Sequence, residues 1–261
     1  LGQSDLTLEA IEFRKNRLTS RKEEAAVEAA VLSAVERYLE VEDFLGAASF
    51  AWNPPQGAPF PVREQADAEA AAGRLRAAWN LGIDPVPNLA EFLEEKGIKV
   101  IFLPLSEKVS GLMCKARRTA GGDVPVIVVN QLDTGERQRF TLAHALAHHI
   151  LDAPAGTAGE KLMHRFASAF LMPADTLWQE VGKNRSSLSL GELFELKAIF
   201  KVSVQAITYR LKDLRIINDA LFGKLFNDFQ RLGWRSPPYD EPGKIVVERP
   251  ERFRRLCFRA A

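Results

Sequence analysis

The sequence predicts an α+β fold in which a small sheet is surrounded by helices. Three runs rich in Val, Ile and Leu predict strands at residues 99–105, 109–115 and 124–130. Segments with apolar residues at helical spacing precede and follow these runs. With 261 residues the chain can bury a substantial core, as one domain with helical additions or as two domains.

The N-terminal part is predicted to contain one long amphipathic helix. Residues 20–45 place apolar residues at helical spacing behind Ser20, a suitable cap. The apolar stripe favours packing on the body of the protein, and a dimer or partner contact is the alternative. Residues 46–62 carry four prolines and two glycines, which predicts an extended linker and a boundary. We therefore expect residues 1–62 to form a helical region with a linker.

The rest of the chain divides into a part that contains the strands, residues 63–188, and a C-terminal helical region with a basic tail, residues 189–261. The helix that starts at Asp133 or Thr134 and ends near Pro154 is the most informative of its elements, because it carries histidines. The helices predicted after residue 62 are 63–81, 88–96, 133–152, 159–171, 190–200, 203–214 and 218–232.

Two features of the C-terminal region each have two interpretations. The helices on either side of Val202 are joined by a tight turn, which is the outline of a DNA-binding helix-turn-helix, but simple packing of a helix pair is favoured. Residues 244–261 are locally basic, which is typical of a solvated face. The formal net charge of +1 excludes a general polyanion binder.

Composition points to a reducing, cytoplasmic location. Cys114 and Cys257 are far apart and form no paired ligand motif, and neither a membrane-spanning run nor a signal peptide is visible. The chain begins at Leu1 and ends at Ala261, directly after a basic run. We expect both ends to have been trimmed.

All four histidines of the chain fall between residues 144 and 164. His144 and His148 are four residues apart, so on a helix they lie one turn apart on one face and can bind a single ion. Zinc accepts this geometry. Ordinary, partly buried helix histidines are the alternative, and the clustering counts against it.

A zinc site takes about three protein ligands, so a third is needed beside His144 and His148. Glu160 is the nearest candidate, on a second helix that would fold back. Asp152 competes with it but is better placed as a cap or as a partner of an imidazole N–H. His164 would also face the site, either as a ligand in place of Glu160 or as a hydrogen-bond donor to an oxyanion. His149 is turned by roughly 100° from His148 on the helix, so we do not expect it to bind the same ion.

The position after His144 carries Ala145. In the metallopeptidase pattern His-Glu-x-x-His this position holds the glutamate that takes a proton from zinc-bound water. Alanine cannot do so, and loss of such a base costs roughly 10²–10⁴-fold in rate. Glu136 is too distant along the helix to replace it. Ala145 is either an engineered replacement, which we favour because alanine is the usual choice, or the mark of a natural pseudoenzyme.

Around these residues the chain resembles the ImmA/IrrE family of bacterial metallopeptidases, over roughly residues 88–234. The resemblance implies a zincin-like fold, with a small twisted sheet and the metal-site helix behind it. It also implies zinc bound by His144, His148 and Glu160. The motifs that carry it are Arg137-Gln138-Arg139-Phe140-Thr141-Leu142-Ala143-His144, Leu146-Ala147-His148-His149, Glu160, His164-Arg165-Phe166-Ala167 and Ala169-Phe170-Leu171-Met172-Pro173.

Members of that family typically cleave a helix-turn-helix repressor and thereby switch on stress-response, prophage or mobile-element genes. Many carry a DNA-binding domain at the N-terminus. Residues 11–15 and 22–25 resemble the segment that follows this domain, so we expect that an upstream DNA-binding domain has been removed.

These observations predict a zinc-dependent regulatory metallopeptidase that is inactive in this chain because of Ala145. Its substrate would be a helix-turn-helix repressor or its own fused regulator. The alternative is a non-catalytic metal-binding sensor or docking module of a transcription regulator, with the basic tail and the helix pair at Val202 as its surfaces. A scaffold that dimerises through residues 20–45 is a third hypothesis.

Overall fold

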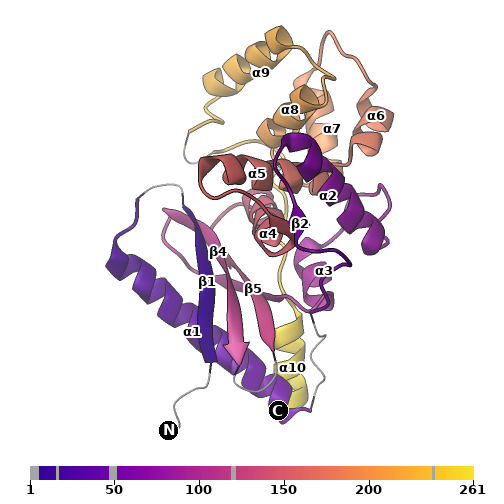
Figure 1. Ribbon diagram of the computed structural model, residues 1–261. Helices are drawn as coiled ribbons and strands as arrows, with labels where there is room; N and C mark the ends of the chain where they lie inside the picture. The colour runs from indigo at the N-terminus through magenta and orange to yellow at the C-terminus, as the bar shows by residue number, and fades with distance from the viewer. Residues whose placement is uncertain (1–5, 16–17, 47–51, 119–121, 237–238) are drawn as a thin grey trace.

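The computed structural model describes residues 6–15, 18–46, 52–118, 122–236 and 239–261, and it confirms the α+β prediction (Figure 1). In this part of the chain a four-stranded mixed sheet carries helices on both faces. β5 pairs antiparallel with β4 and parallel with β3, whereas β1 pairs antiparallel with the other side of β4. The strands in spatial order are β1 (Leu6–Lys15), β4 (Val109–Arg118), β5 (Asp123–Asn130) and β3 (Lys99–Leu103).

β1 is the one strand of this sheet that the sequence analysis did not predict. The expectation of a helical N-terminal region is wrong for residues 6–15, which pair with β4 instead. A register shift between Glu9 and Glu12, with Ala10 at a φ of 50°, interrupts the simple alternation of apolar residues and hides the strand in the sequence. The sheet thus joins residues from two of the three expected regions, and the division of the chain into three domains stays a prediction.

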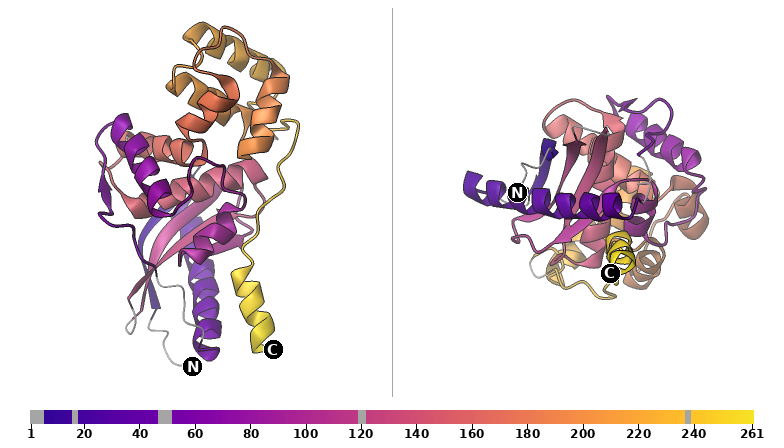
Figure 2. Two further views of the ribbon diagram at one scale, coloured as in Figure 1. Left: turned by 90° about the vertical axis from the view of Figure 1, so that its right-hand side faces the viewer. Right: turned by 90° about the horizontal axis from the view of Figure 1, so that it is seen from below.

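α1 (Arg21–Phe44) covers one face of the sheet (Figure 2). It begins where predicted, because the Ser20 side chain accepts from Glu23 N–H at 3.2 Å and the Glu23 carboxylate accepts from Ser20 N–H at 2.7 Å. Its apolar stripe is buried against the sheet, which confirms the packing interpretation. The buried apolar residues that form this stripe include Val31, Val35 and Leu39.

α4 (Gly135–Ile150) packs on the opposite face, α5 packs against α4, and α2 packs against α5 (Figure 1). Directly after α4, the short strand β6 pairs in parallel with β2, so the chain leaves the helix in a defined direction. The helices predicted at 63–81, 88–96, 133–152 and 159–171 are confirmed. Their bounds, with those of the two short strands, are β2 (Phe60–Pro61), α2 (Gln65–Ala78), α3 (Leu89–Glu95), β6 (Leu151–Asp152) and α5 (Thr157–Leu171).

The C-terminal helices form a separate layer beyond α5 (Figure 1). The helix pair around Val202 is confirmed as two helices with a tight turn. Arg210, on the second of them, is buried, donates to the carbonyl of Met172 at 3.0 Å and pairs with Glu69, so this helix packs on the body of the protein. The helices of this layer are α6 (Ala174–Val181), α7 (Leu190–Phe200), α8 (Val204–Asp213) and α9 (Asp219–Arg231).

The basic tail ends in α10 (Arg252–Ala260), which runs beside α1 (Figure 2). The Phe253 ring stacks on Tyr38 of α1 at 5.0 Å between centroids, and Leu256 is buried. The buried Glu94 carboxylate accepts from the backbone N–H of Arg252 at 3.1 Å. The interpretation of the tail as a simple solvated face is therefore wrong for this helix, since one side of it is packed. None of the helices in the described ranges combines the length and apolar character that a membrane span requires.

Candidate metal site

His144 and His148 lie one turn apart on α4 with ring centroids 5.0 Å apart. His144 is buried, with 3% of its surface exposed, and His148 is partly buried. Both rings face the same pocket. The helical spacing thus places the two imidazoles on one face, as their positions in the sequence indicated.

Glu160, in the first turn of α5, reaches both rings. Its Oε2 lies 3.2 Å from Nε2 of His144, and its Oε1 lies 3.6 Å from Nε2 of His148. The preceding Gly159 allows this approach, because a Cβ there would lie 1.8 Å from the carbonyl oxygen of Pro154. The absence of a side chain at residue 159 therefore lets α5 start against the loop that follows β6.

The protonation states of these groups suit a divalent cation. Nε2 of His144 is buried without a hydrogen bond, which leaves a lone pair beside the Glu160 carboxylate. Burial lowers the pKa of His144, which favours the neutral imidazole that binds zinc. The residues present therefore fit a metal ion.

The candidate ligand atoms fall into two groups that share Glu160. One group contains His144, Glu160 and His164, the other contains Glu12, His148 and Glu160, and within each group the atoms lie within 4.8 Å of one another. The ring of His164 lies 4.5 Å from that of His144 between centroids. The structure thus brings together His144, His148, Glu160 and His164, as the sequence indicated. It adds Glu12 from β1.

The pocket beside these residues is small, with a cavity volume of about 20 Å³. Ala145 lies on its wall and is 5% exposed, so its methyl group occupies the place where a glutamate side chain would enter the pocket. Its lining residues are Glu12, Phe13, Arg14, Leu112, Met113, Thr141, His144, Ala145, His148 and Glu160.

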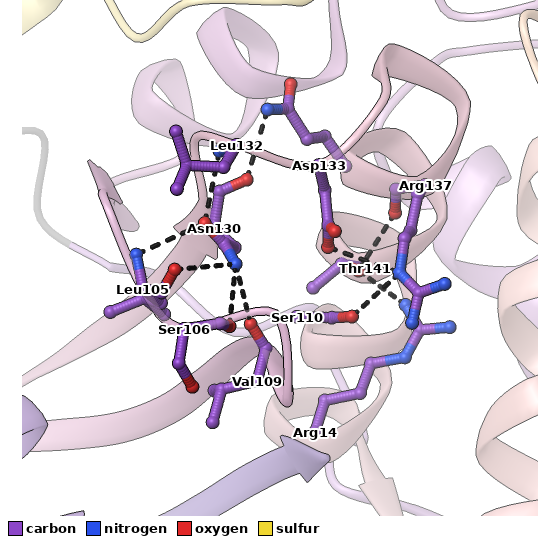
Figure 3. Close-up of polar contacts among 11 residues, drawn as sticks. Arg14, Leu105, Ser106, Val109, Ser110, Asn130, Leu132, Asp133, Arg137 and Thr141 are labelled. Carbon is purple, nitrogen blue, oxygen red and sulfur yellow. Dashed lines mark hydrogen bonds and ion pairs between the residues drawn. The ribbon is translucent and has the colours of Figure 1, made fainter. Parts of the chain in front are cut away.

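Arg14 brings a half-buried positive charge to the same pocket. Its Nη1 donates to Oγ1 of Thr141 on α4, and its guanidinium lies 5.3 Å from the centroid of the Phe140 ring (Figure 3). Burial, with Arg137 nearby, lowers the pKa of Arg14 to about 10. The guanidinium stays charged at neutral pH and fastens β1 to the metal-site helix.

The start of α4 is fixed by Asn130 at the end of β5 (Figure 3). Its side-chain amide donates to the carbonyl of Val109 at 2.9 Å and its Oδ1 accepts from the backbone N–H of Leu132 at 3.1 Å. Its own carbonyl accepts from the Gln138 side chain on α4 at 3.1 Å. A buried polar network thereby sets how the metal-site helix leaves the sheet.

Asp152, the alternative to Glu160, and His149 make contacts elsewhere. Nε2 of His149 is 3.3 Å from the carbonyl oxygen of Val126 in β5, and burial lowers the pKa of His149 to about 4. Asp152 pairs with Arg63 at 2.8 Å, beside the β2–β6 ladder. Asp152 is thus held by the neighbouring strand pair.

Glu12 and Arg14 are the site residues that sequence reasoning missed. Their separation from α4 in sequence and the irregular register of β1 leave no local pattern that would connect them with the histidines. Residues 11–15 resemble the segment that follows the DNA-binding domain in family members, which singled out this stretch of the sequence. The resemblance did not indicate where these residues lie in the fold.

Residues 93–212 match the family model Peptidase_M78, described as the IrrE N-terminal-like domain. The match runs from α3 to α8 and includes His144, His148 and Glu160, whereas β1 with Glu12 lies outside it. No curated protein matches the chain.

Proposed function

The chain carries a metallopeptidase domain of the Peptidase_M78 family, IrrE N-terminal-like, at residues 93–212, and from this we propose that it is a zinc-dependent regulatory peptidase of the ImmA/IrrE type. His144, His148 and Glu160 would hold the ion. The observation that supports this most directly is the buried, unbonded Nε2 of His144 beside the Glu160 carboxylate.

A zinc ion bound there would supply a Lewis acid and lower the pKa of a bound water. The chain's own residues would supply the rest. His164, whose ring lies 4.5 Å from that of His144 between centroids, would donate a hydrogen bond to a developing oxyanion. Arg14 adds a half-buried positive charge that would stabilise the negative charge of that oxyanion.

The form with Ala145 is inactive in this proposal. A methyl group can neither take a proton nor orient a water, so α4 supplies no general base at this position. We favour replacement of an original glutamate by design over natural loss, because the other motif positions persist in the sequence.

The substrate would be a regulatory protein, either a helix-turn-helix repressor or a regulator fused to the chain itself. Among the described strands, β1 is an edge of the sheet and contributes three residues to the pocket wall. An extended protein segment would pair with such an edge and present its carbonyl groups to the site. A cytoplasmic location and a role in stress-response transcription belong to the same proposal.

The test is to restore the carboxylate with Ala145→Glu and to incubate the zinc-loaded protein with a co-expressed helix-turn-helix repressor and with a proteome-derived peptide mixture. Mass spectrometry then counts new N-termini. We expect Ala145→Glu to generate them at least 10²-fold faster than the Ala145 form, and a chelator to stop the reaction. Ala145→Gln is the control, since it has a similar size and no basic carboxylate. A zinc-loaded Ala145→Glu protein that cleaves nothing would refute the peptidase.

The alternative, a non-catalytic metal-binding sensor or docking module, is favoured by Ala145 itself. It requires alanine to be the original residue. Zinc binding without any cleavage by Ala145→Glu would support it and exclude the peptidase.

A further inference from the structure

We propose that Glu12 of β1 positions His148 for metal binding, by accepting a hydrogen bond from its Nδ1–H. This inference rests on the zinc site proposed above. Glu12 lies outside the residues that match the peptidase family, so the inference concerns a part of the chain that the family match leaves unassigned.

The His148 ring lies between two carboxylates, one at each nitrogen. Oε2 of Glu12 is 3.3 Å from Nδ1, and Oε1 of Glu160 is 3.6 Å from Nε2. A neutral imidazole carries one proton, so only one of these nitrogens can donate. A proton on Nδ1 satisfies Glu12 and leaves the Nε2 lone pair facing Glu160 and the other candidate ligands.

The same arrangement recurs in metal centres, where a ligating histidine donates its second N–H to a carboxylate, which fixes the tautomer and the orientation of the ring. Asp152 was the sequence-based candidate for this role, but it pairs with Arg63. Glu12, from a distant part of the chain, would accept the N–H of His148 instead. Its side chain is 58% exposed, whereas that of His148 is 10% exposed, so the contact lies at the rim of the pocket.

The position of Glu12 is set by β1. Glu12 pairs with Met113 of β4 after the register shift that follows Glu9. Arg14, two residues further on and therefore on the same face of the strand, is held by Thr141 of α4. The strand is thus fastened to the metal-site helix next to Glu12. Metal affinity should consequently depend on the docking of the N-terminal strand, although the three main ligands lie on α4 and α5.

The experiment is a competition titration of zinc against a chromogenic chelator, with the full chain. Glu12→Ala should weaken zinc binding by about 10- to 100-fold, the range typical for loss of such a partner. Glu12→Gln keeps an acceptor oxygen and should recover most of the affinity. Glu9→Ala is the matched control, because Glu9 lies on the same strand but pairs with Arg117 at 3.0 Å. It should bind zinc as the parent does.

A second measurement reads the tautomer directly. Nitrogen-15 NMR of the histidine rings, recorded on zinc-free protein, should show His148 protonated at Nδ1 in the parent chain and a mixture of tautomers in Glu12→Ala. A change that acted only through stability would leave the tautomer as it is. Because the parent spectrum needs no variant, the proposal can be refuted even if Glu12→Ala does not fold.

Three outcomes would overturn the inference. The first is a zinc affinity of Glu12→Ala equal to that of the parent. The second is a His148 ring that is protonated at Nε2 in the parent. In both cases the zinc site itself would stand. A parent chain that binds no zinc would refute the zinc site and the role of Glu12 together, and this distinguishes the two failures.

Discussion

Nε2 of His144 on α4 and Oε2 of Glu160 on α5 lie 3.2 Å apart, and the nitrogen is buried without a hydrogen bond. A cation between them would satisfy both groups. A buried polar atom without a partner costs roughly 1–3 kcal/mol, so an ion bound between these two groups would stabilise the fold.

We therefore predict one zinc ion per chain and at least a 100-fold loss of affinity in His144→Ala. Metal content after dialysis and a chelator titration measure both. His149→Asn is the control, since His149 contacts the carbonyl of Val126 instead, and it should keep the metal. Equal zinc affinity in His144→Ala and the parent would show that the ion, if any, binds elsewhere.

Gly159 provides a second prediction. A Cβ there would lie 1.8 Å from the carbonyl oxygen of Pro154, so Gly159→Ala must displace the first turn of α5 and with it Glu160. We expect a loss of roughly 1–3 kcal/mol in the free energy of unfolding, together with weaker zinc binding. Thermal unfolding and the chelator titration test this.

Gly223 in α9 provides the control for Gly159, because a Cβ at residue 223 would have nothing within 4 Å. Gly223→Ala should be neutral or stabilise the protein by up to about 1 kcal/mol. If the two variants behaved alike, the crowding at Pro154 would not govern the position of α5.

Lys197 of α7 connects three parts of the chain. Its Nζ lies 2.7 Å from Oε1 of Glu136 on α4 and 2.7 Å from Oε1 of Glu241, and its side chain is 2% exposed. Lys197→Met would leave two buried carboxylates without their cation, which typically costs about 3–5 kcal/mol. Denaturant unfolding measures the difference.

Lys212 is the control for that experiment, since its pair with Asp219 is exposed. Lys212→Met should change the free energy of unfolding by no more than about 1 kcal/mol. A cost for Lys197→Met in the same small range would mean that the buried network contributes little.

The two free cysteines should differ in reactivity. Burial raises the pKa of Cys114 to about 12, so at pH 8 almost none of it is thiolate, whereas Cys257 lies on the partly exposed α10. A thiol reagent with a mass-spectrometric readout should modify Cys257 rapidly and Cys114 only as fast as the protein unfolds. Equal rates in the folded protein would contradict the packing of α1 on β4.

The local structure of most of the chain followed from the sequence, because it depends on neighbouring residues. Ser20 and Glu23 form the capping box that starts α1, and the apolar spacing behind them predicted the length of the helix. The four-residue spacing of His144 and His148 also requires only that their segment is helical.

The tertiary structure decided which distant residues meet those two imidazoles. Glu160 reaches them because α5 starts tightly against Pro154. Glu12 and Arg14 reach them because β1 pairs with β4 across a bulge, in which residues 10 and 11 lie opposite the single residue 114. Helical periodicity carries no information about such contacts, since they depend on strand pairing and on the packing of elements far apart in the chain. The sequence thus determined the spacing of the candidate pair, His144 and His148, whereas the fold determined that the carboxylates of Glu12 and Glu160 and the guanidinium of Arg14 surround it.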